Sequence, residues 1–149
     1  IYEARAALET AALRKAAPSI SVAQLASLTA LCDSLEAATK AGEIDALPER
    51  VVALHRGICA LAGNAVLLRF FEALSHDIIV LMRWIGLIYV NGPDVVARNR
   101  RLIATIATRD SARAAEEVAA YIEETRARTL RQFAELQRSR GSVLKGARR

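Results

Sequence analysis

The chain has 149 residues, the length of one domain, and 53% of them are hydrophobic, which is enough to bury a core. The apolar residues are mainly 30 Ala and 18 Leu, against 7 Gly, 3 Pro and 5% aromatic residues. Ala and Leu favour helices and β-favouring aromatic residues are scarce, so the composition favours an all-α fold over a β-sandwich. The apolar content also excludes a disordered chain.

The net charge of +5 is unevenly distributed along the chain. Residues 126–149 contribute +7, whereas residues 1–125 contribute −2. A basic end of this kind is typical of contact with nucleic acid or an acidic membrane. It is also typical of a solvated helix end whose arginines favour the C-terminal dipole, and we favour this second interpretation.

We expect neither a secretory segment nor a membrane span. Residues 1–15 carry charges within their apolar pattern, and the longest uncharged run, 16–32, is interrupted by Pro18 and several polar residues. Cys32 and Cys59 lie far apart in apolar surroundings and share no CxxC spacing. We therefore expect two buried thiols in a reducing compartment, and a cytoplasmic protein with no membrane partner.

Caps and helix-breaking residues divide the chain into six expected helices. These cover residues 2–17, 21–41, 46–62, 65–90, 93–108 and 110 or 111 to about 138. The expected N-caps are Ser21, Asp45, Asn64 and Asp110 or Ser111, the expected C-terminal glycines are Gly42 and Gly63, and residues 91–93 form a corner. Short connections predict an antiparallel bundle of six helices, or seven where the fourth breaks near His76 and Asp77.

The fourth expected helix is apolar nearly all round, which is typical of a helix at the centre of a bundle or at a subunit interface. A monomer would leave a large apolar patch on this helix exposed.

No enzyme motif is present. The sequence contains no GxSxG, GxGxxG or Walker pattern, and its two histidines, His55 and His76, are not in an HExxH arrangement. No two carboxylates share an inward helical face, where one could act as an acid and the other as a base. We therefore expect a protein that is not an enzyme.

Polar residues occupy inward positions on four of the expected helices. His55 shares a stripe with Val51 and Ile58, Asn99 with Val96 and Ile103, Tyr121 with Val118 and Thr125, and Arg5 with Leu8 and Ala12. Buried polar atoms need partners. The stripes therefore predict either a ligand cavity or a closed hydrogen-bonded core.

Three segments together resemble the FCD domain, the C-terminal effector-binding domain of FadR-type regulators in the GntR family. The first runs from Tyr2 to Glu9 and on through the alanine-rich stretch to Ala17. The second is Leu54-His55 with Leu61-Ala62-Gly63-Asn64 and Leu67, similar to a Phe-His…Ala-Gly-Asn-x-x-Leu stretch. The third is Ile103, Ala104 and Ile106 followed by Asp110, Ala114 and Ala115, similar to an Ile-x-x-Ala-Ile…Asp…Ala segment. The similarity covers residues 2–125.

The resemblance implies an all-α bundle around a central pocket and a homodimer. It also implies an N-terminal winged helix-turn-helix that binds DNA, a module absent from this chain. We expect residues 1–140 to form the FCD-like effector-binding and dimerisation domain, and residues 141–149 a flexible basic tail.

Many FCD domains hold a divalent metal with one Asp and three His, and this chain departs from that pattern. Val51 stands at the Asp position, His55 keeps the first His, and Asn99 and Tyr121 replace the other two. One imidazole with an amide and a phenol is a poor site for Zn, Ni or Mn. The resemblance therefore implies a member without metal or other cofactor, whose effector meets the side chains directly.

We predict a domain that binds a small organic acid or acyl effector and thereby controls DNA binding. The expected ligand-binding residues are Arg5, His55, Asn99, Tyr121, Val51, Ile103 and Trp84. The resemblance places Arg5 at the pocket, where its guanidinium would grip a carboxylate. The alternative for Arg5 is an exposed ion pair with Glu9, four residues on.

Two further alternatives remain open at this stage. Trp84 and Arg83 either pack in the core and at a surface, or one of them lines the pocket. The whole chain could also be an α-helical interaction module in which His55, Asn99 and Tyr121 close a polar core without any small ligand. A cavity above about 300 Å³ would favour the sensor, and a packed centre would favour the module.

Overall fold

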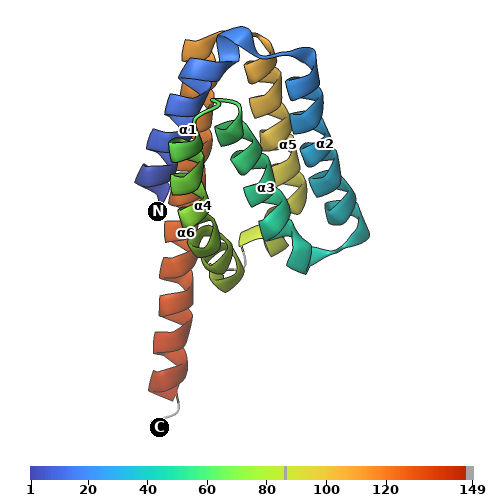
Figure 1. Cartoon of the computed structure of the whole chain (residues 1–149). Helices are drawn as coiled ribbons and strands as arrows, with labels where there is room; N and C mark the ends of the chain where they lie inside the picture. Colours follow the sequence, from blue (N-terminus) through green and yellow to red (C-terminus); the bar gives the residue numbers. More distant parts are fainter. Residues whose placement is uncertain (86, 147–149) are drawn as a thin grey trace.

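The protein is an all-α bundle (Figure 1). The computed structural model describes the backbone of residues 1–85 and 87–146 and the side chains of 1–84 and 92–138. The described residues form six α-helices, two short 3-10 helices and no strand. The α-helices are α1 (Tyr2–Ala16), α2 (Val22–Ala41), α3 (Leu47–Ala60), α4 (Ala65–Ile85), α5 (Leu87–Ala107) and α6 (Ser111–Gly146). The 3-10 helices, η1 (Ala17–Ser19) and η2 (Ile44–Ala46), follow α1 and precede α3.

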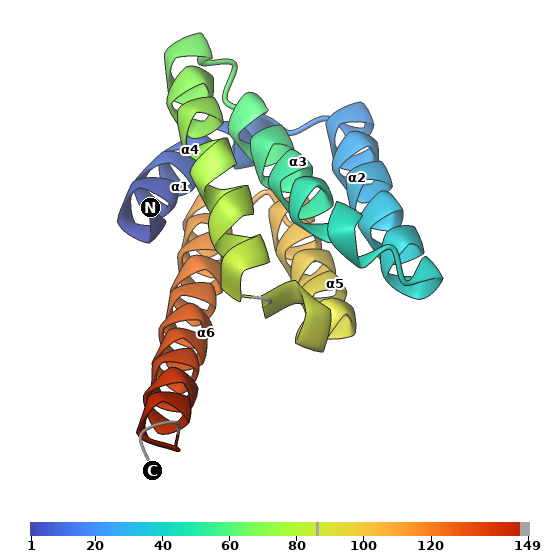
Figure 2. The same ribbon diagram turned by 90° about the horizontal axis from the view of Figure 1, so that it is seen from below.

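Helices distant in sequence lie side by side in the bundle. α1 packs along α6 and also contacts α3 and α4, while α2 packs against α3 and α5. α5 in turn packs against α6, and the lower part of α6 extends away from the other helices (Figures 1 and 2). No helix within the described part of the chain is both long and apolar enough to span a bilayer.

Most of the expected helix ends are confirmed by their hydrogen bonds. Ser21 forms a capping box with Gln24, and Gly42 closes α2 with a left-handed φ of 69°. The Asn64 Oδ1 atom accepts bonds from the amides of Val66 and Leu67, at 3.1 Å each. Asp110 caps α6 in the same way. These side chains satisfy amides that the first turn of a helix leaves without partners.

Two expectations about the ends of α3 and α4 are wrong. Asp45 lies within η2, and α3 starts at Leu47 after Ala46 without a side-chain cap. The 3-10 turn delivers the chain directly into the helix, and Pro48 in the first turn lacks an amide to satisfy. α4 runs through His76 and Asp77 without a break, so the seventh helix does not form.

The corner expected at residues 91–93 is also wrong. These residues lie within α5, which begins at Leu87 and contains Pro93. The physical reason for Gly92 is close packing: a Cβ atom there would lie 2.9 Å from Cγ2 of Thr39 on α2. Gly92 thus lets two helices approach and does not form a turn.

α6 is longer than the sequence indicates. Its backbone stays helical to Gly146, through most of the segment expected to be a flexible tail, and residues 147–149 lie outside the described residues. The charged residues after 125 therefore prolong the helix.

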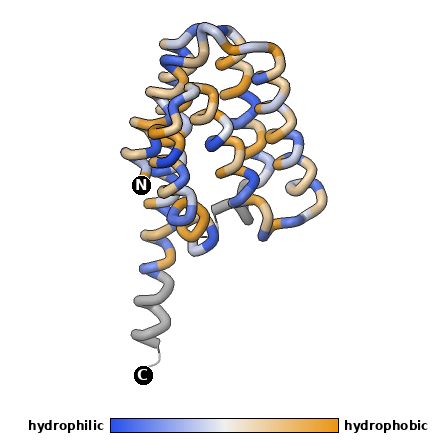
Figure 3. Tube along the Cα trace, in the orientation of Figure 1, coloured by the Kyte–Doolittle hydropathy of each residue, from blue (hydrophilic) through white to orange (hydrophobic). Residues whose placement is uncertain are grey.

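Apolar and polar residues alternate along the helices (Figure 3), and the buried apolar side chains form two clusters. One includes Val51 and Val96 with residues of α4. The other includes Ile58, Ile103 and Tyr121 with Leu13 and neighbours. Val51 and Ile58 lie one turn before and after His55 on α3, so His55 lies where the clusters meet.

Candidate functional site

Six polar side chains from four helices are buried together, and we call them the polar centre. They are Arg5 and Glu9 of α1, His55 of α3, Arg98 and Asn99 of α5, and Tyr121 of α6. Their exposed fractions lie between 0% and 6%. The inward positions predicted for Arg5, His55, Asn99 and Tyr121 are therefore confirmed. The helical period fixes the direction of a side chain whether it is polar or apolar.

Arg5, Glu9 and His55 form a chain of polar contacts at the base of this centre. Nε of Arg5 donates to Oε1 of Glu9 at 3.0 Å, and Nδ1 of His55 lies 2.6 Å from Oε2 of the same carboxylate. The alternative of a pair with Glu9 is thus realised, but in the core and not on an exposed face. Each oxygen of Glu9 has one partner, which satisfies a buried charge.

Burial and charge set the protonation of this chain. Burial lowers the pKa of His55, and the guanidiniums of Arg5 and Arg98 act in the same direction against the opposing effect of Glu9. Burial alone would raise the pKa of Glu9, but His55 and Arg5 outweigh it and hold that pKa below its usual value. At neutral pH the geometry therefore places a neutral His55 whose Nδ1–H donates to an ionised Glu9.

Tyr121 is surrounded by the other members of the polar centre. Nδ2 of Asn99 donates to its hydroxyl at 3.2 Å and to the carbonyl of Val95 at 2.9 Å. The His55 and Tyr121 ring centroids are 4.8 Å apart, and Cζ of Arg98 lies 4.2 Å from the centroid of the Tyr121 ring. Burial raises the pKa of Tyr121 against the opposing charge of Arg98, so its hydroxyl stays neutral.

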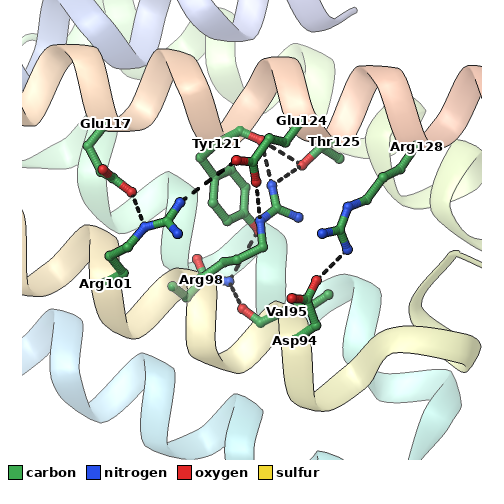
Figure 4. A network of polar contacts seen from close by, with 10 residues as sticks. Asp94, Val95, Arg98, Arg101, Glu117, Tyr121, Glu124, Thr125 and Arg128 are labelled. Carbon is green, nitrogen blue, oxygen red and sulfur yellow. Dashed lines mark hydrogen bonds and ion pairs between the residues drawn. The ribbon is translucent and has the colours of Figure 1, made fainter.

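Arg98 connects this centre with the molecular surface (Figure 4). Its Nη2 atom donates to the carbonyl of Tyr121 at 2.7 Å and to Oγ1 of Thr125 at 2.9 Å. Its Nε atom lies 3.1 Å from Oε2 of Glu124, which is 47% exposed. Further ion pairs, Arg101 with Glu117 and Arg128 with Asp94, join α5 and α6 on either side.

Three buried polar atoms of the polar centre lack a hydrogen-bond partner among the described residues. They are Nε2 of His55, Nε of Arg98 and Oδ1 of Asn99. Nε of Arg98 is close to Glu124, but the contact is electrostatic and does not have hydrogen-bond geometry. With Nδ1–H directed at Glu9, Nε2 of His55 is an acceptor. The centre thus offers two acceptors without a donor and one N–H whose contact with a carboxylate is misaligned, which is unusual for buried groups.

The other expected ligand residues divide into two groups. Val51 and Ile103 are buried beside the polar centre, at 1% and 8% exposure. Trp84 is 55% exposed and lies against Phe133 in a tilted ring pair with 5.5 Å between centroids, so it does not lie with the others. Arg83 pairs with Glu49 on the surface, which is its predicted surface role.

Of the four metal-ligand positions that the resemblance implies, only that of His55 carries the expected ligating side chain. Within the described ranges, no three side chains of His, Cys, Asp or Glu are grouped in a way that could hold a metal ion. Val51 and Asn99 supply a methyl surface and an amide where carboxylate and imidazole ligands would stand. The residues present therefore do not fit a divalent metal, and its absence from the mechanism stays a prediction. Cys32 and Cys59 are buried free thiols, as expected.

Two members of the polar centre are not predicted from the sequence. Glu9 is expected only in an exposed ion pair, and Arg98 is not singled out. A signal for Arg98 exists, because Val95, Arg98 and Leu102 follow steps of three and four and all are buried. The burial of Glu9 depends on contact with α3, which no spacing within α1 reveals.

Comparison with known proteins identifies the family to which the chain belongs. The family model described as the FCD domain matches residues 1–124. No curated protein and no solved structure was found to match the chain. The family match includes all six residues of the polar centre. The protein therefore belongs to the FCD family, the effector-binding domains of GntR-type transcription regulators.

Proposed function

We propose that this domain senses a small organic acid or acyl compound, which binds in the polar centre and controls DNA binding by a winged helix-turn-helix joined to it. The observation that carries the proposal is the convergence of His55, Arg98 and Asn99 with three unpartnered polar atoms around one ring, that of Tyr121. Buried groups without partners make a site selective for a molecule that supplies them.

Different side chains contact different parts of the effector. Nε2 of His55 and Oδ1 of Asn99 accept hydrogen bonds from hydroxyl or amide groups of the effector, because an ionised carboxylate has no hydrogen to donate. Val51 and Ile103 contact the apolar portion of the effector. Arg5 and Glu9 fix the His55 tautomer through Nδ1, in the way that a second residue orients a catalytic or ligating histidine. No metal takes part, so elemental analysis of the purified protein should find less than one Zn, Ni or Mn per ten chains.

The effector reaches this centre through a conformational change. Arg5, Glu9, His55 and Asn99 are at most 2% exposed, so in this proposal the effector binds an open state in which they become accessible. A ligand that binds only an open state shifts the population towards it, and the shift can be passed to an attached domain.

The test is binding of carboxylates to the purified domain. Straight-chain monocarboxylates from acetate to octanoate, succinate, glutarate and the hydroxy acids lactate and 3-hydroxybutyrate would be titrated at pH 7, with thermal unfolding and calorimetry as measurements. At least one should bind saturably to the wild type and to His76→Gln, whose side chain is exposed and lies outside both the polar centre and the dimer contact proposed below. The same compound should bind Asn99→Leu at least tenfold more weakly.

A second candidate function has an observation in its favour. The polar centre is closed to solvent and most of its members bind one another, as in an interaction module without a small ligand. If no carboxylate of the panel binds the wild type, and Asn99→Leu is as stable as the wild type, this candidate replaces the sensor.

We also propose that the domain forms a homodimer through what we call the α4 stripe. Its members, spaced alternately by four and three residues and all exposed, are Val66, Phe70, Ala73, Asp77, Val80 and Trp84. This spacing is that of helix-on-helix packing, and four of the six side chains are large and apolar. A second copy of the same helix presents the same spacing, which suits a two-fold interface.

A further inference from the structure

The two buried guanidiniums of the polar centre are each paired with a carboxylate, and the two carboxylates differ greatly in their exposure to solvent. Arg5 is paired with Glu9, which is 0% exposed and also bound by Nδ1 of His55. Arg98 is paired with Glu124, which is 47% exposed. A carboxylate that already borders water can leave its partner at low cost, whereas a buried one cannot.

Glu124 also has a second cation within reach. Its Oε1 atom lies 4.0 Å from Nη2 of Arg101, which is 54% exposed. Figure 4 shows Glu124 between the guanidiniums of Arg98 and Arg101, with dashed lines to both. Glu124 can therefore move from the inner to the outer arginine and remain paired.

Arg98 itself is held in place without Glu124. Two hydrogen bonds from Nη2 and the ring of Tyr121 beneath its guanidinium fix its orientation from the protein side. Its Nε–H has no hydrogen-bond acceptor within the described structure. A fixed guanidinium whose Nε–H makes only a misaligned contact with Glu124 leaves room for a better-aligned carboxylate to replace it.

We propose that Arg98, and not Arg5, receives the carboxylate of the effector, and that Glu124 is a built-in carboxylate which the effector displaces towards Arg101. This inference rests on the proposed function. The exchange keeps the charge around Arg98 constant, because one carboxylate replaces another. At Arg5 an added carboxylate would lie beside Glu9, so two negative charges would share one buried cation.

The experiment removes the carboxylate of Glu124, which in this proposal competes with the effector for Arg98. Acetate is titrated into the wild type, Glu124→Gln and Glu117→Gln at constant ionic strength, with chloride as the replaced anion. Arginine Nε–H signals in ¹⁵N–¹H NMR spectra give the affinity. Glu117→Gln is the matched control, because Glu117 is also an α6 carboxylate paired with an α5 arginine, Arg101, at 2.6 Å.

We expect Glu124→Gln to bind acetate about fivefold more tightly than the wild type, with a shift of the Arg98 Nε–H signal. Glu117→Gln should bind acetate as the wild type does. Adding Arg98→Lys to Glu124→Gln should remove the gain, because an ammonium lacks the two-pronged geometry of a guanidinium. Because Glu124→Gln leaves the buried guanidinium of Arg98 without its counter-charge, urea unfolding first checks that the variant is folded at the temperature of the titration.

Equal acetate affinity in the wild type and Glu124→Gln, or an equal gain in Glu117→Gln, would overturn the exchange. If a panel carboxylate still binds the wild type in that case, the sensor function stands and its acid contacts another residue. If no carboxylate binds the wild type or either variant, both the exchange and the sensor function fail.

Discussion

At the scale of single residues, we expect the free energy of unfolding of this domain to depend on the buried ion pair between Arg5 and Glu9. Glu9→Gln keeps the shape of the side chain but leaves the guanidinium of Arg5 buried without a counter-charge. We expect the free energy of unfolding to fall by about 3–5 kcal/mol, measured by urea denaturation.

Glu123→Gln is the control for this prediction, because it removes an equivalent charge from an exposed pair with Arg126. Its stability should equal that of the wild type. Replacing Arg5 and Glu9 together by Met should restore much of the loss, since no charge is then left alone. A Glu9→Gln protein as stable as the wild type would contradict the buried pair.

His55 gives the domain a predictable response to pH. Burial lowers the pKa of His55 in the folded state, so below about pH 6.5 the unfolded chain takes up a proton that the folded chain does not. The stabilising contribution of neutral His55 is therefore complete above that pH and is lost as the pH falls. We expect the free energy of unfolding to decrease by up to about 1.4 kcal/mol per pH unit between pH 6.5 and 5.

The chain provides its own control, since its other histidine, His76, is exposed. Urea unfolding at several pH values should show the wild-type slope in His76→Gln and a shallower slope in His55→Gln. The explanation is wrong if His55→Gln retains the full slope.

At the scale of secondary structure, the sequence predicts which face of each helix is buried, but not which residues meet across helices. The periodic stripes place His55, Asn99 and Tyr121 correctly, because a helix repeats every 3.6 residues whatever its neighbours are. They do not show that Glu9 of α1 lies against His55 of α3, which depends on how two helices are set against each other. Arg98 was missed because an arginine on an apolar stripe suggests an exposed edge.

The same distinction explains the wrong corner at residues 91–93. Asn-Gly-Pro is a common turn sequence, yet a glycine also serves where two backbones come close. Only the packing of α2 against α5 decides between the two. The predicted end of the last helix, at about residue 138, falls short of Gly146 for a related reason, because arginines and glutamates are good helix formers as well as common in tails.

Gly92 provides a test at this scale. Gly92→Ala would favour a helix by propensity, but its Cβ would lie 2.9 Å from Cγ2 of Thr39. We expect a net loss of about 1–3 kcal/mol in the free energy of unfolding.

Thr39→Ser removes that methyl group and keeps the hydroxyl that donates to the carbonyl of Leu35. The Gly92→Ala/Thr39→Ser double variant should recover most of the loss. If Gly92→Ala instead stabilises the protein, the close contact between α2 and α5 does not exist.

At the scale of the whole molecule, the α4 stripe predicts the assembly state. Exposed Phe70 and Trp84, at 62% and 55%, would be covered by a second copy of the chain. Sedimentation velocity at about 10 μM should give a dimer for the wild type and a monomer for Phe70→Glu.

Arg69→Glu, which alters the charge of the neighbouring exposed residue off the stripe, should remain a dimer. A monomeric wild type, or dissociation of both variants alike, would rule out the stripe as the contact.

The last helix carries a mechanical consequence. α6 has 36 residues and is thus about 54 Å long, and its lower part extends away from the other helices (Figure 1). Contacts with α1, α5 and α4 hold the helix to the bundle as far as Phe133, whose ring lies against Trp84. From Phe133 to Gly146 the arm measures roughly 20 Å, so a tilt of about 10° at Phe133 would move its far end by roughly 3 Å. Trp84, the last residue of the α4 stripe, is therefore also in contact with the point from which this arm would turn.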